Sequence, residues 1–481
     1  MNKKLVFNVT GRLLLALSLL MTLPIAVSLI YREKAAWAFL FTAILSLFLG
    51  AVLVFFTKGC SNVLYAKEGF LIVSLAWLLT SFLGALPFVI SGEVKSFIDA
   101  FFETASGFST TGASVISDVE ALSKGILFWR SFTHWIGGMG VLVFMIAFVS
   151  NISDRSIHIL RAEMPGPIVG KMTPRAKDTT KVLYVMYIVM TVIQVVLLSL
   201  GDMSFFESLL HTFGTAGTGG FSTQNNSLIE YSDYSHWVIT VFMFLFGVNF
   251  NLYYLILIKR FKSAVKSTEL WVYFAIISIS ALVITGNVMS LYDSFSSAIK
   301  DALFQVVSIS TTTGYATANF DLWPTLSKGI IFILMFIGAC AGSTAGGLKV
   351  SRVIILFKMI HKEIKKMVHP RSVTSVKFEG KEVDDNTQRS VTTYFAVYFI
   401  FIFAVFFILS FEPFSFETNF TATVSCFNNV GPGLDGVGPM MNYGAYSNFS
   451  KLVLSFAMLF GRLEIFPLLI AMIPSSWRKK S

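Results

Sequence analysis

Four short segments rich in glycine and threonine, each set between two apolar runs, constrain the fold of this chain of 481 residues more than any other feature. The run before each segment is too short to cross a bilayer, whereas the run after it is long enough, because a crossing helix needs about 20 residues. Four loops that dip into the membrane around a central glycine predict a ring of backbone carbonyls suited to a cation. The segments occupy residues 109–114 (STTGAS), 217–222 (GTGGFS), 311–316 (TTTGYA) and 428–433 (NNVGPG).

The composition is that of a membrane protein. Hydrophobic residues make up 55% of the chain and charged residues only 13%, whereas a soluble domain carries about 25% charge. The first apolar run is long, and no clean small-residue cleavage pattern follows it, so we expect a retained span rather than a signal peptide. Ten runs are long enough to cross a bilayer: residues 12–31, 36–57, 70–91, 125–149, 182–200, 236–258, 270–290, 327–350, 391–411 and 450–473.

The last eight spans pair into four units of span, short amphipathic helix, Gly/Thr loop and span. The short helices are expected to begin near Ser96, Ser204, Ser296 and Ser415, because a serine followed closely by an acidic residue is typical of a helix start. We therefore predict an all-α membrane protein with four pseudo-repeats of span, half-helix, pore loop and span around a central pore, plus two N-terminal transmembrane helices. The predicted units are residues 1–68 (two N-terminal helices), 69–150 (repeat 1), 151–262 (a cytosolic loop and repeat 2), 263–365 (repeat 3 with an intramembrane loop) and 366–481 (a cytosolic loop and repeat 4).

The lysines and arginines behind the net charge of +10 are distributed unevenly along the chain, and their distribution indicates the membrane topology. With the N-terminus in the cytoplasm, alternating spans place 28 of the 37 lysines and arginines inside and 7 outside, as the positive-inside rule requires. The four Gly/Thr loops then fall on the outer, acidic side, and both termini are cytoplasmic. This distribution argues against a nucleic-acid partner. The densest inside stretches are residues 155–181, 259–266, 349–389 and 478–480.

A single Thr-Thr-Gly is ordinarily a tight turn, but four copies on one predicted face favour a shared function. Glycine allows successive carbonyls to point at one axis, and threonine hydroxyls add oxygen ligands below them. None of the four six-residue segments contains Asp or Glu. A hard monovalent cation that must leave again needs such neutral oxygens, so we expect an ion-conducting protein.

These motifs resemble the TrkH/KtrB/HKT superfamily of potassium transporters, and the two extra N-terminal spans and the GSTAGGLKV motif at 342–350 resemble its bacterial TrkH branch most. The resemblance implies K⁺ uptake across the bacterial inner membrane through a pseudo-four-fold pore within one subunit. It also implies a homodimer and a cytosolic partner ring of the TrkA type, which would bind the regulating nucleotide. Carried onto this sequence, the K⁺ filter residues are Thr110, Thr111, Gly112, Thr218, Gly219, Gly220, Thr312, Thr313, Gly314, Asn429, Val430 and Gly431.

Two features of this filter are specific to the sequence. The second filter glycine is either Gly220 or Gly219, and we prefer Gly220 because it aligns Phe221 and Ser222 with Ala113 and Ser114. Only one glycine per loop is shared, unlike the Thr-Val-Gly-Tyr-Gly of a strict potassium channel. We therefore expect preference for K⁺ with measurable passage of Na⁺ or Rb⁺.

The span that begins near Ser327 is interrupted by glycines from 338 to 347. Small residues at this density also suit close helix packing, whereas the resemblance implies an intramembrane loop that obstructs the pore and moves on activation. Arg462 lies inside the last span, where a charge needs water or a partner. Local pairing with Glu464 or extension of the side chain to the interface is one interpretation, although residues two apart do not face each other on a helix, whereas the resemblance places Arg462 in the pore. The predicted gate residues are Gly342, Ser343, Thr344, Ala345, Gly346, Gly347, Lys349 and Arg462.

Other polar residues in the spans have plainer interpretations. Arg130 is expected to anchor a half-helix, His134 to be a packing histidine, and Asn249 either to bond across spans or to line the inner pore. The isolated cysteines, Cys60, Cys340 and Cys426, are expected to be buried and inert. A coupled secondary transporter such as a K⁺/H⁺ or K⁺/Na⁺ symporter is the alternative to a channel. A membrane enzyme is not expected, because no metal cluster, nucleophile–base pair or phosphate-binding motif is present.

Overall fold

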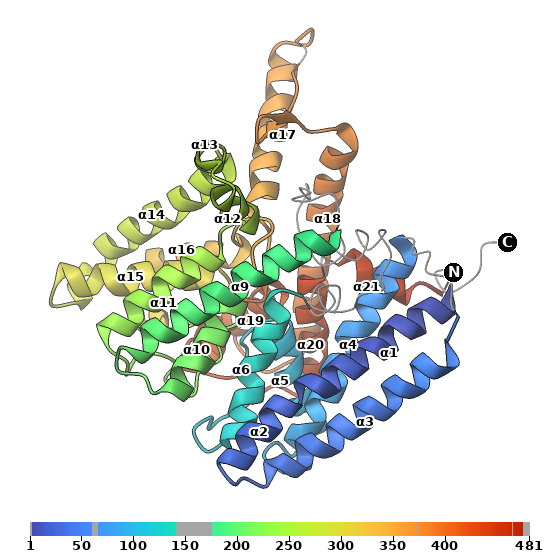
Figure 1. Ribbon diagram of the computed structural model, residues 1–481. Helices are drawn as coiled ribbons and strands as arrows, with labels where there is room; N and C mark the ends of the chain where they lie inside the picture. The colour runs from blue at the N-terminus through green and yellow to red at the C-terminus, as the bar shows by residue number, and fades with distance from the viewer. Residues whose placement is uncertain (1, 60–65, 141–175, 373, 464, 475–481) are drawn as a thin grey trace.

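The computed structural model describes residues 2–59, 66–140, 176–372, 374–463 and 465–474, and within them the chain is almost entirely helical (Figure 1). The one sheet in this described part is a short antiparallel hairpin of β1 (Lys377–Phe378) and β2 (Lys381–Glu382). The helices are α1 (Lys3–Leu20), α2 (Thr22–Ile30), α3 (Ala35–Phe56), α4 (Ala66–Ile90), α5 (Phe97–Phe108), α6 (Lys124–Gly138), α9 (Ala176–Ser199), α10 (Phe205–Gly217), α11 (Asp233–Phe246), α12 (Phe250–Leu257), α13 (Phe261–Val265), α14 (Thr268–Val288), α15 (Phe295–Ser310), α16 (Thr325–Phe336), α17 (Val350–Val368), α18 (Asp385–Leu409), α19 (Phe416–Asn428), α20 (Asn448–Arg462) and α21 (Phe466–Met472). Three short 3₁₀ turns lie at Met289–Leu291, Phe320–Leu322 and Asp435–Val437.

The all-α membrane fold predicted from the sequence is confirmed. Six described helical segments are long and apolar enough to cross a bilayer: α1 with α2, α3, α4, α9, α14 and α18. They correspond to six of the ten predicted spans, namely the two N-terminal ones and the first span of each repeat. In repeats 2 to 4 these first spans are α9, α14 and α18, and each of them leaves much of its apolar surface exposed for contact with lipid.

The second span of each repeat differs from the prediction, because the described helix that begins it ends before the predicted span does. In repeat 2, α11 and α12 meet at 89° across Gly247–Asn249. The Asn249 side chain accepts a hydrogen bond from the Asn251 N–H (2.9 Å) and so caps α12. This cap is a structural role for a residue whose role the sequence left open. In repeat 4, α20 ends at Arg462 and α21 begins at Phe466.

The remaining two second spans are also shorter than predicted. In repeat 3, α16 has only 12 residues, followed by an irregular segment, residues 337–349, which we call the inner loop. In repeat 1, α6 ends at Gly138, and the rest of the predicted span to residue 149 lies outside the described residues, as do Cys60, most of the basic stretch 155–181 and the basic residues 478–480. A continuous apolar run therefore overestimates helix length, and in all four repeats the helix ends within two residues of a glycine.

The four short helices form as their sequences predict. Serine caps α5, α10 and α19 at Ser96, Ser204 and Ser415, each accepting a bond from a backbone N–H three residues later. At α10 the Glu207 side chain also bonds the Ser204 N–H, which completes a capping box. The third start was predicted two residues late, because Ser294 rather than Ser296 caps α15.

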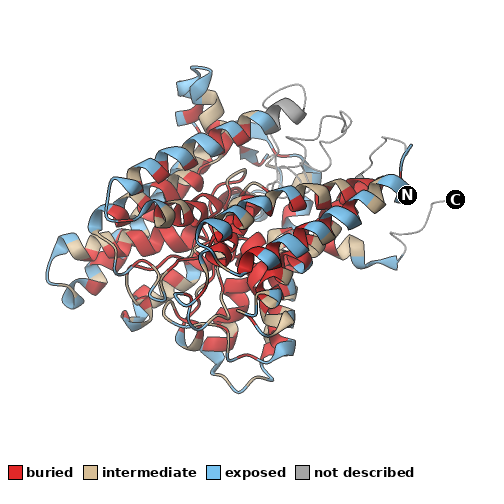
Figure 2. Cartoon of the chain, turned by 60° about the horizontal axis from the view of Figure 1, so that its bottom comes forward, coloured by how far each residue is buried: buried red, intermediate tan, exposed pale blue. Residues whose placement is uncertain are grey.

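Buried residues concentrate around these short helices at the centre, while exposed residues lie along the outward faces of the surrounding helices (Figure 2). All four short helices end near the centre of the bundle. By contrast, α17 projects away from it, with α13 on the same side (Figure 1). This projecting helix is amphipathic and basic, and Lys365 and Lys366 lie in its last turn.

Candidate functional site: four central loops and the loop beneath them

Each short helix ends in a loop with the same backbone conformation. We call these residues central loop 1 (110–112), loop 2 (218–220), loop 3 (312–314) and loop 4 (429–431). In every loop the first and third residues have positive φ, between 56° and 58° at the first position and between 75° and 102° at the glycine. The glycines are Gly112, Gly220, Gly314 and Gly431. Because a residue with a Cβ rarely adopts the conformation of this third position, glycine is required there in all four loops.

The end of each short helix is closed by the same hydrogen bond. The N–H of the middle loop residue donates to the carbonyl five residues earlier, at 2.9 Å from Thr111, 2.8 Å from Gly219, 2.8 Å from Thr313 and 2.9 Å from Val430. This is the Schellman pattern, with threonine or asparagine in the left-handed position instead of the usual glycine. It turns the chain sharply at the helix C-terminus, so that the negative end of each helix dipole lies at the loops.

The four glycines lie around one centre. A Cβ at Gly112 would collide with the Gly219 carbonyl oxygen, one at Gly220 with that of Thr313, and one at Gly314 with that of Val430. The ring closes because a Cβ at Gly431 would lie 2.7 Å from the carbonyl oxygen of Thr111. Each loop therefore touches the next in the order 1, 2, 3, 4 and back to 1.

In central loop 2, Gly220 is the equivalent of the other three glycines. It has φ of +75°, and its close neighbour is the carbonyl oxygen of loop 3. Gly219 is not among the residues with positive φ, and a Cβ there would meet the ring of His134 instead. The backbone thus distinguishes two adjacent glycines that the sequence left as alternatives.

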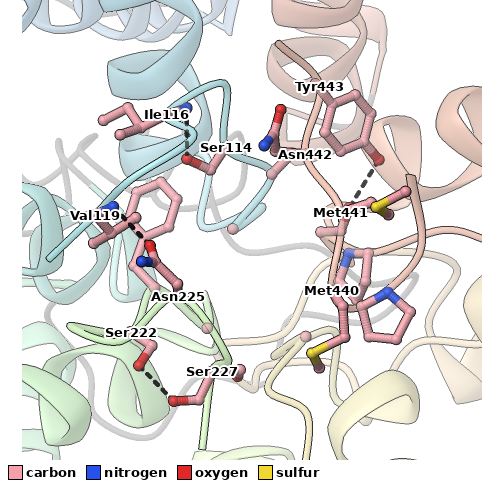
Figure 3. A pocket seen from close by; sticks show the side chains of 18 of the residues that line it. Ser114, Ile116, Val119, Ser222, Asn225, Ser227, Met440, Met441, Asn442 and Tyr443 are labelled. Carbon is pink, nitrogen blue, oxygen red and sulfur yellow. Dashed lines mark hydrogen bonds between the residues drawn. The ribbon is translucent and has the colours of Figure 1, made fainter. Parts of the chain in front are cut away.

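A cavity of about 180 Å³ opens above this ring, and all four glycines line it. Figure 3 shows that residues following three of the loops surround it, including Ser114, Asn225 and Asn442. Its lining contains hydroxyl and amide groups and the Arg130 guanidinium, and no carboxylate. A cation in this cavity would meet neutral oxygens.

A buried ion pair fastens the outer part of repeats 1 and 2. Arg130 on α6 binds Glu103 on α5 at 2.5 Å, and both side chains are almost fully buried. The same guanidinium donates to the Ser222 carbonyl oxygen (3.0 Å) and lies 3.6 Å from the centre of the Phe221 ring. Glu103 also accepts bonds from Ser114. These contacts agree with the expected anchoring role of Arg130.

Two further side chains hold the loops in place. The Phe221 N–H donates to His134 Nε2 (3.3 Å), so the ring proton is on Nδ1, which donates to the Gly107 carbonyl oxygen (2.8 Å). His134 is fully buried and is a packing histidine, as expected. In repeat 4 the Tyr443 hydroxyl donates to the Gly431 carbonyl oxygen (2.8 Å). Both contacts fix the position of a central loop from outside the ring.

The inner loop lies directly beneath the ring. Its two ends are joined by a hydrogen bond from the Gly338 N–H to the Leu348 carbonyl oxygen (2.7 Å). The loop also packs on the break in repeat 2, where the Cys340 N–H donates to the Gly247 carbonyl oxygen (3.1 Å). At its tip the Gly346 N–H donates to Thr312 Oγ1 (2.7 Å), and the Thr218 hydroxyl bonds the Thr344 carbonyl oxygen (3.1 Å). The inner loop therefore contacts central loops 2 and 3 through their side chains.

Arg462 binds both the inner loop and repeat 1. Its guanidinium donates to the carbonyl oxygens of Thr344 (2.8 Å), Gly137 (2.7 Å) and Gly138 (2.9 Å). This agrees with a central position below the ring. The alternative pairing with Glu464 falls outside the described residues. Lys349 donates to the Ala345 carbonyl oxygen within the inner loop itself.

Sequence reasoning missed Glu269, which binds the inner loop and the first turn of α17 directly after it. Its carboxylate, only 4% exposed, accepts bonds from the Ala341 N–H (2.7 Å) and the Ser351 N–H (3.1 Å). In turn the Glu269 N–H donates to Glu379 on the β-hairpin (3.0 Å). In the sequence, Glu269 is merely an acidic residue in the first turn of a span, so only the long-range contacts reveal its role.

The described residues contain no cluster of three or more His, Cys, Asp or Glu side chains that could hold a metal ion. Cys340 and Cys426 are buried, as expected. The groups available to an ion are the carbonyl oxygens of the central loops and the side-chain oxygens at their inner ends. Oxygens of this kind suit hard cations.

The chain is similar to cation transport proteins along its whole length. The model of the TrkH family, described as cation transport protein, matches residues 36–479. The Trk system potassium uptake protein TrkH of Escherichia coli strain K12 is 35% identical over 486 residues, covering 100% of each chain, and the TrkH of Vibrio parahaemolyticus is 36% identical over 98% of this chain and 99% of its own. The crystal structure of the potassium transporter TrkH from Vibrio parahaemolyticus matches with a TM-score of 0.89 and 35% identity, over 99% of this chain and 100% of that chain.

Proposed function

Because this chain belongs to the TrkH family of cation transport proteins, we propose that it mediates K⁺ uptake across the bacterial cytoplasmic membrane. The observation that carries the proposal is the closed ring of central loops, in which each glycine touches a carbonyl of the next loop. Peptide oxygens around one axis can replace the hydration shell of a monovalent cation. The names of its full-length relatives, which are potassium uptake proteins, support K⁺ as that cation.

In this proposal K⁺ enters from the outer cavity and is received by the carbonyls of the K⁺ filter. The residues of the four central loops are the filter, with Gly220 as the second filter glycine. The ends of four helix dipoles add negative potential without a fixed charge, so the ion is attracted but can leave. With one shared glycine per loop, we expect K⁺ preference and some passage of Na⁺ or Rb⁺.

The inner loop and Arg462 form the gate. The loop lies below the filter, and the guanidinium bound to Thr344 places a positive charge on the path of the cation. A buried positive charge repels a cation strongly where water is scarce. Opening then requires that the inner loop leave Thr218, Thr312 and Arg462.

The family resemblance extends this proposal to the assembly. The protein acts as a homodimer with a cytosolic TrkA-like ring, and the regulating nucleotide binds that partner. Both termini, α13 and α17 lie on the cytoplasmic side. The basic charge of α17 supports this orientation.

The proposal is tested by complementation of a bacterium that lacks K⁺ uptake, with and without a co-expressed partner ring. Gly112→Ala should abolish growth at low K⁺, because the Cβ would strike the Gly219 carbonyl and the required φ is +81°. Gly286→Ala, where a Cβ meets open space, is the matched control and should grow normally. Equal uptake of Na⁺ and K⁺ by purified protein in vesicles would reject K⁺ preference. Early saturation with counterflow would favour a coupled carrier over a channel.

A further inference from the structure

The first residues of the four central loops are structurally equivalent but make different contacts with the inner loop. Thr110, Thr218, Thr312 and Asn429 are all fully buried and all have φ between 56° and 58°. Three of these side chains face the inner loop. Thr218 and Thr312 bond it directly, and a Cβ on Gly346 would lie 3.0 Å from Asn429 Oδ1. The Thr110 methyl faces Gly137, whose carbonyl oxygen binds Arg462.

The lone pairs of these four oxygens are not equally engaged. Thr312 Oγ1 accepts the Gly346 N–H (2.7 Å), which occupies a lone pair. Thr218 only donates, its single proton being shared between the carbonyl oxygens of Gly217 (2.6 Å) and Thr344 (3.1 Å), so both of its lone pairs remain available. A carbonyl or hydroxyl oxygen binds a cation through its lone pairs. The inner loop therefore leaves Thr312 only one lone pair for a cation and points the positive end of an N–H dipole at the same oxygen, which weakens Thr312 as a ligand but not Thr218.

The other two oxygens have no hydrogen-bond partner among the described residues, although they are buried. These are Thr110 Oγ1 and Asn429 Oδ1. A buried polar atom left without a partner is costly, so two such atoms at equivalent positions indicate a ligand. Asn429 is held in place by its amide nitrogen, which donates to Thr111 Oγ1 and to the Met458 carbonyl oxygen, both at 2.9 Å. Its oxygen is thus fixed by contacts that do not use the oxygen itself.

We propose that the inner loop and a monovalent cation compete for the Thr312 hydroxyl. When a cation occupies the inner end of the filter, the ion and the positive end of the Gly346 N–H dipole repel each other at the shared Thr312 oxygen, which weakens the bond to Gly346 and favours release of the loop. When the site is empty, the loop binds Thr312 again and returns the Arg462 charge to the pore through Thr344. This regulation rests on the proposed K⁺ uptake and makes the gate sensitive to the ion that it controls.

The pseudo-symmetry supplies a matched control. Thr312→Val removes both a cation ligand and the acceptor of the inner loop, whereas Thr110→Val removes an equivalent ligand that makes no bond to the loop. If both threonines served the cation alone, the two variants would behave alike. Under competition, Thr312→Val raises the basal K⁺ flux without partner roughly tenfold, the effect of one lost buried hydrogen bond, whereas Thr110→Val lowers it, because it removes a cation ligand and leaves the bond between Thr312 and the inner loop intact.

The direct test measures access to the inner loop in full-length protein in vesicles. Ser343→Cys is placed in a chain whose cysteines at 60, 340 and 426 are replaced, and its labelling by a thiol reagent is followed in K⁺ and in a large impermeant cation. We expect K⁺ to speed labelling in the parent, to speed it in Thr110→Val only at higher K⁺ concentration because one cation ligand is lost, and to have no effect in Thr312→Val. Thr312→Ser, which keeps the hydroxyl, should behave like the parent, and Thr312→Ala replaces the valine variant if that fails to fold.

Two outcomes would overturn the inference. One is an equal K⁺ effect in Thr312→Val and Thr110→Val. The other is that K⁺ slows the labelling of the parent, or leaves its rate unchanged, although the same vesicles take up K⁺. In that second case the proposed uptake stands and only the competition falls, whereas vesicles that take up no K⁺ at all with the partner ring present would refute the proposed function itself.

Discussion

Glu269 gives the sharpest prediction about the proposed gate, because one carboxylate binds the inner loop at Ala341 and the first turn of α17 at Ser351. It accepts the Ala341 N–H at 2.7 Å and the Ser351 N–H at 3.1 Å in a site where it is 4% exposed. Hydrogen bonds to a charged group contribute about 1.5–3 kcal/mol each. Loss of both in Glu269→Ala therefore costs the closed loop at least about 3 kcal/mol, which shifts its opening equilibrium by about 100-fold.

The assay is uptake of K⁺ or Rb⁺ into vesicles that contain the purified protein without its partner. Glu269→Ala should raise this basal uptake strongly, up to the limit at which every molecule is open. Glu269→Gln keeps a neutral acceptor oxygen and should give an intermediate rise, since neutral hydrogen bonds are about half as strong.

Glu379→Gln is the matched control. Glu379 accepts bonds from Ser267 and from the Glu269 N–H, both at 3.0 Å, and so caps the start of α14 at a distance from the inner loop along the chain. Its replacement should change stability more than basal uptake. If Glu269→Ala remains monodisperse and takes up K⁺ no faster than the parent, the tether does not hold the gate closed.

Three further predictions follow from the contacts around the site. Arg462→Ala should raise basal K⁺ flux and Arg462→Lys should raise it less, because lysine keeps the charge below the filter; unchanged flux in both would count against a pore position. Arg130→Met should destabilise the protein by about 3–5 kcal/mol, because it leaves the Glu103 carboxylate buried and unpaired. The double variant Arg130→Met with Glu103→Gln should recover part of that stability, as measured by thermal unfolding. Hydrogen bonds from Ser415 and Thr418 lower the pKa of the Asp435 carboxyl, so its contribution to stability is present above about pH 4 and is lost as the pH falls further. The melting temperatures of the parent and Asp435→Asn should differ at pH 7 and converge at pH 3; a constant difference would exclude this linkage.

Local signals in the sequence predicted the repeated helices well. The serine caps at Ser96, Ser204 and Ser415 and the long apolar runs act within a few residues, so they can be read without knowledge of the fold. The prediction failed at the second span of each repeat, where the helix ends within two residues of a glycine. The breaks at Gly247 and in the inner loop are stabilised by bonds between repeats 2 and 3, such as that of the Cys340 N–H to the Gly247 carbonyl oxygen.

The sequence by itself determined that this is an all-α membrane protein with four glycine-centred loops, because hydrophobic run length, capping and the φ tolerance of glycine are properties of short segments. The tertiary structure decided which glycine of loop 2 joins the ring, that Glu269 fastens the inner loop, and that Thr312 alone of its four equivalents accepts a bond from it. Each of these depends on atoms that meet across more than 30 residues of chain, such as Thr312 and Gly346. The order of residues along the chain does not by itself specify these long-range contacts, because they form only when the four repeats pack around a common centre.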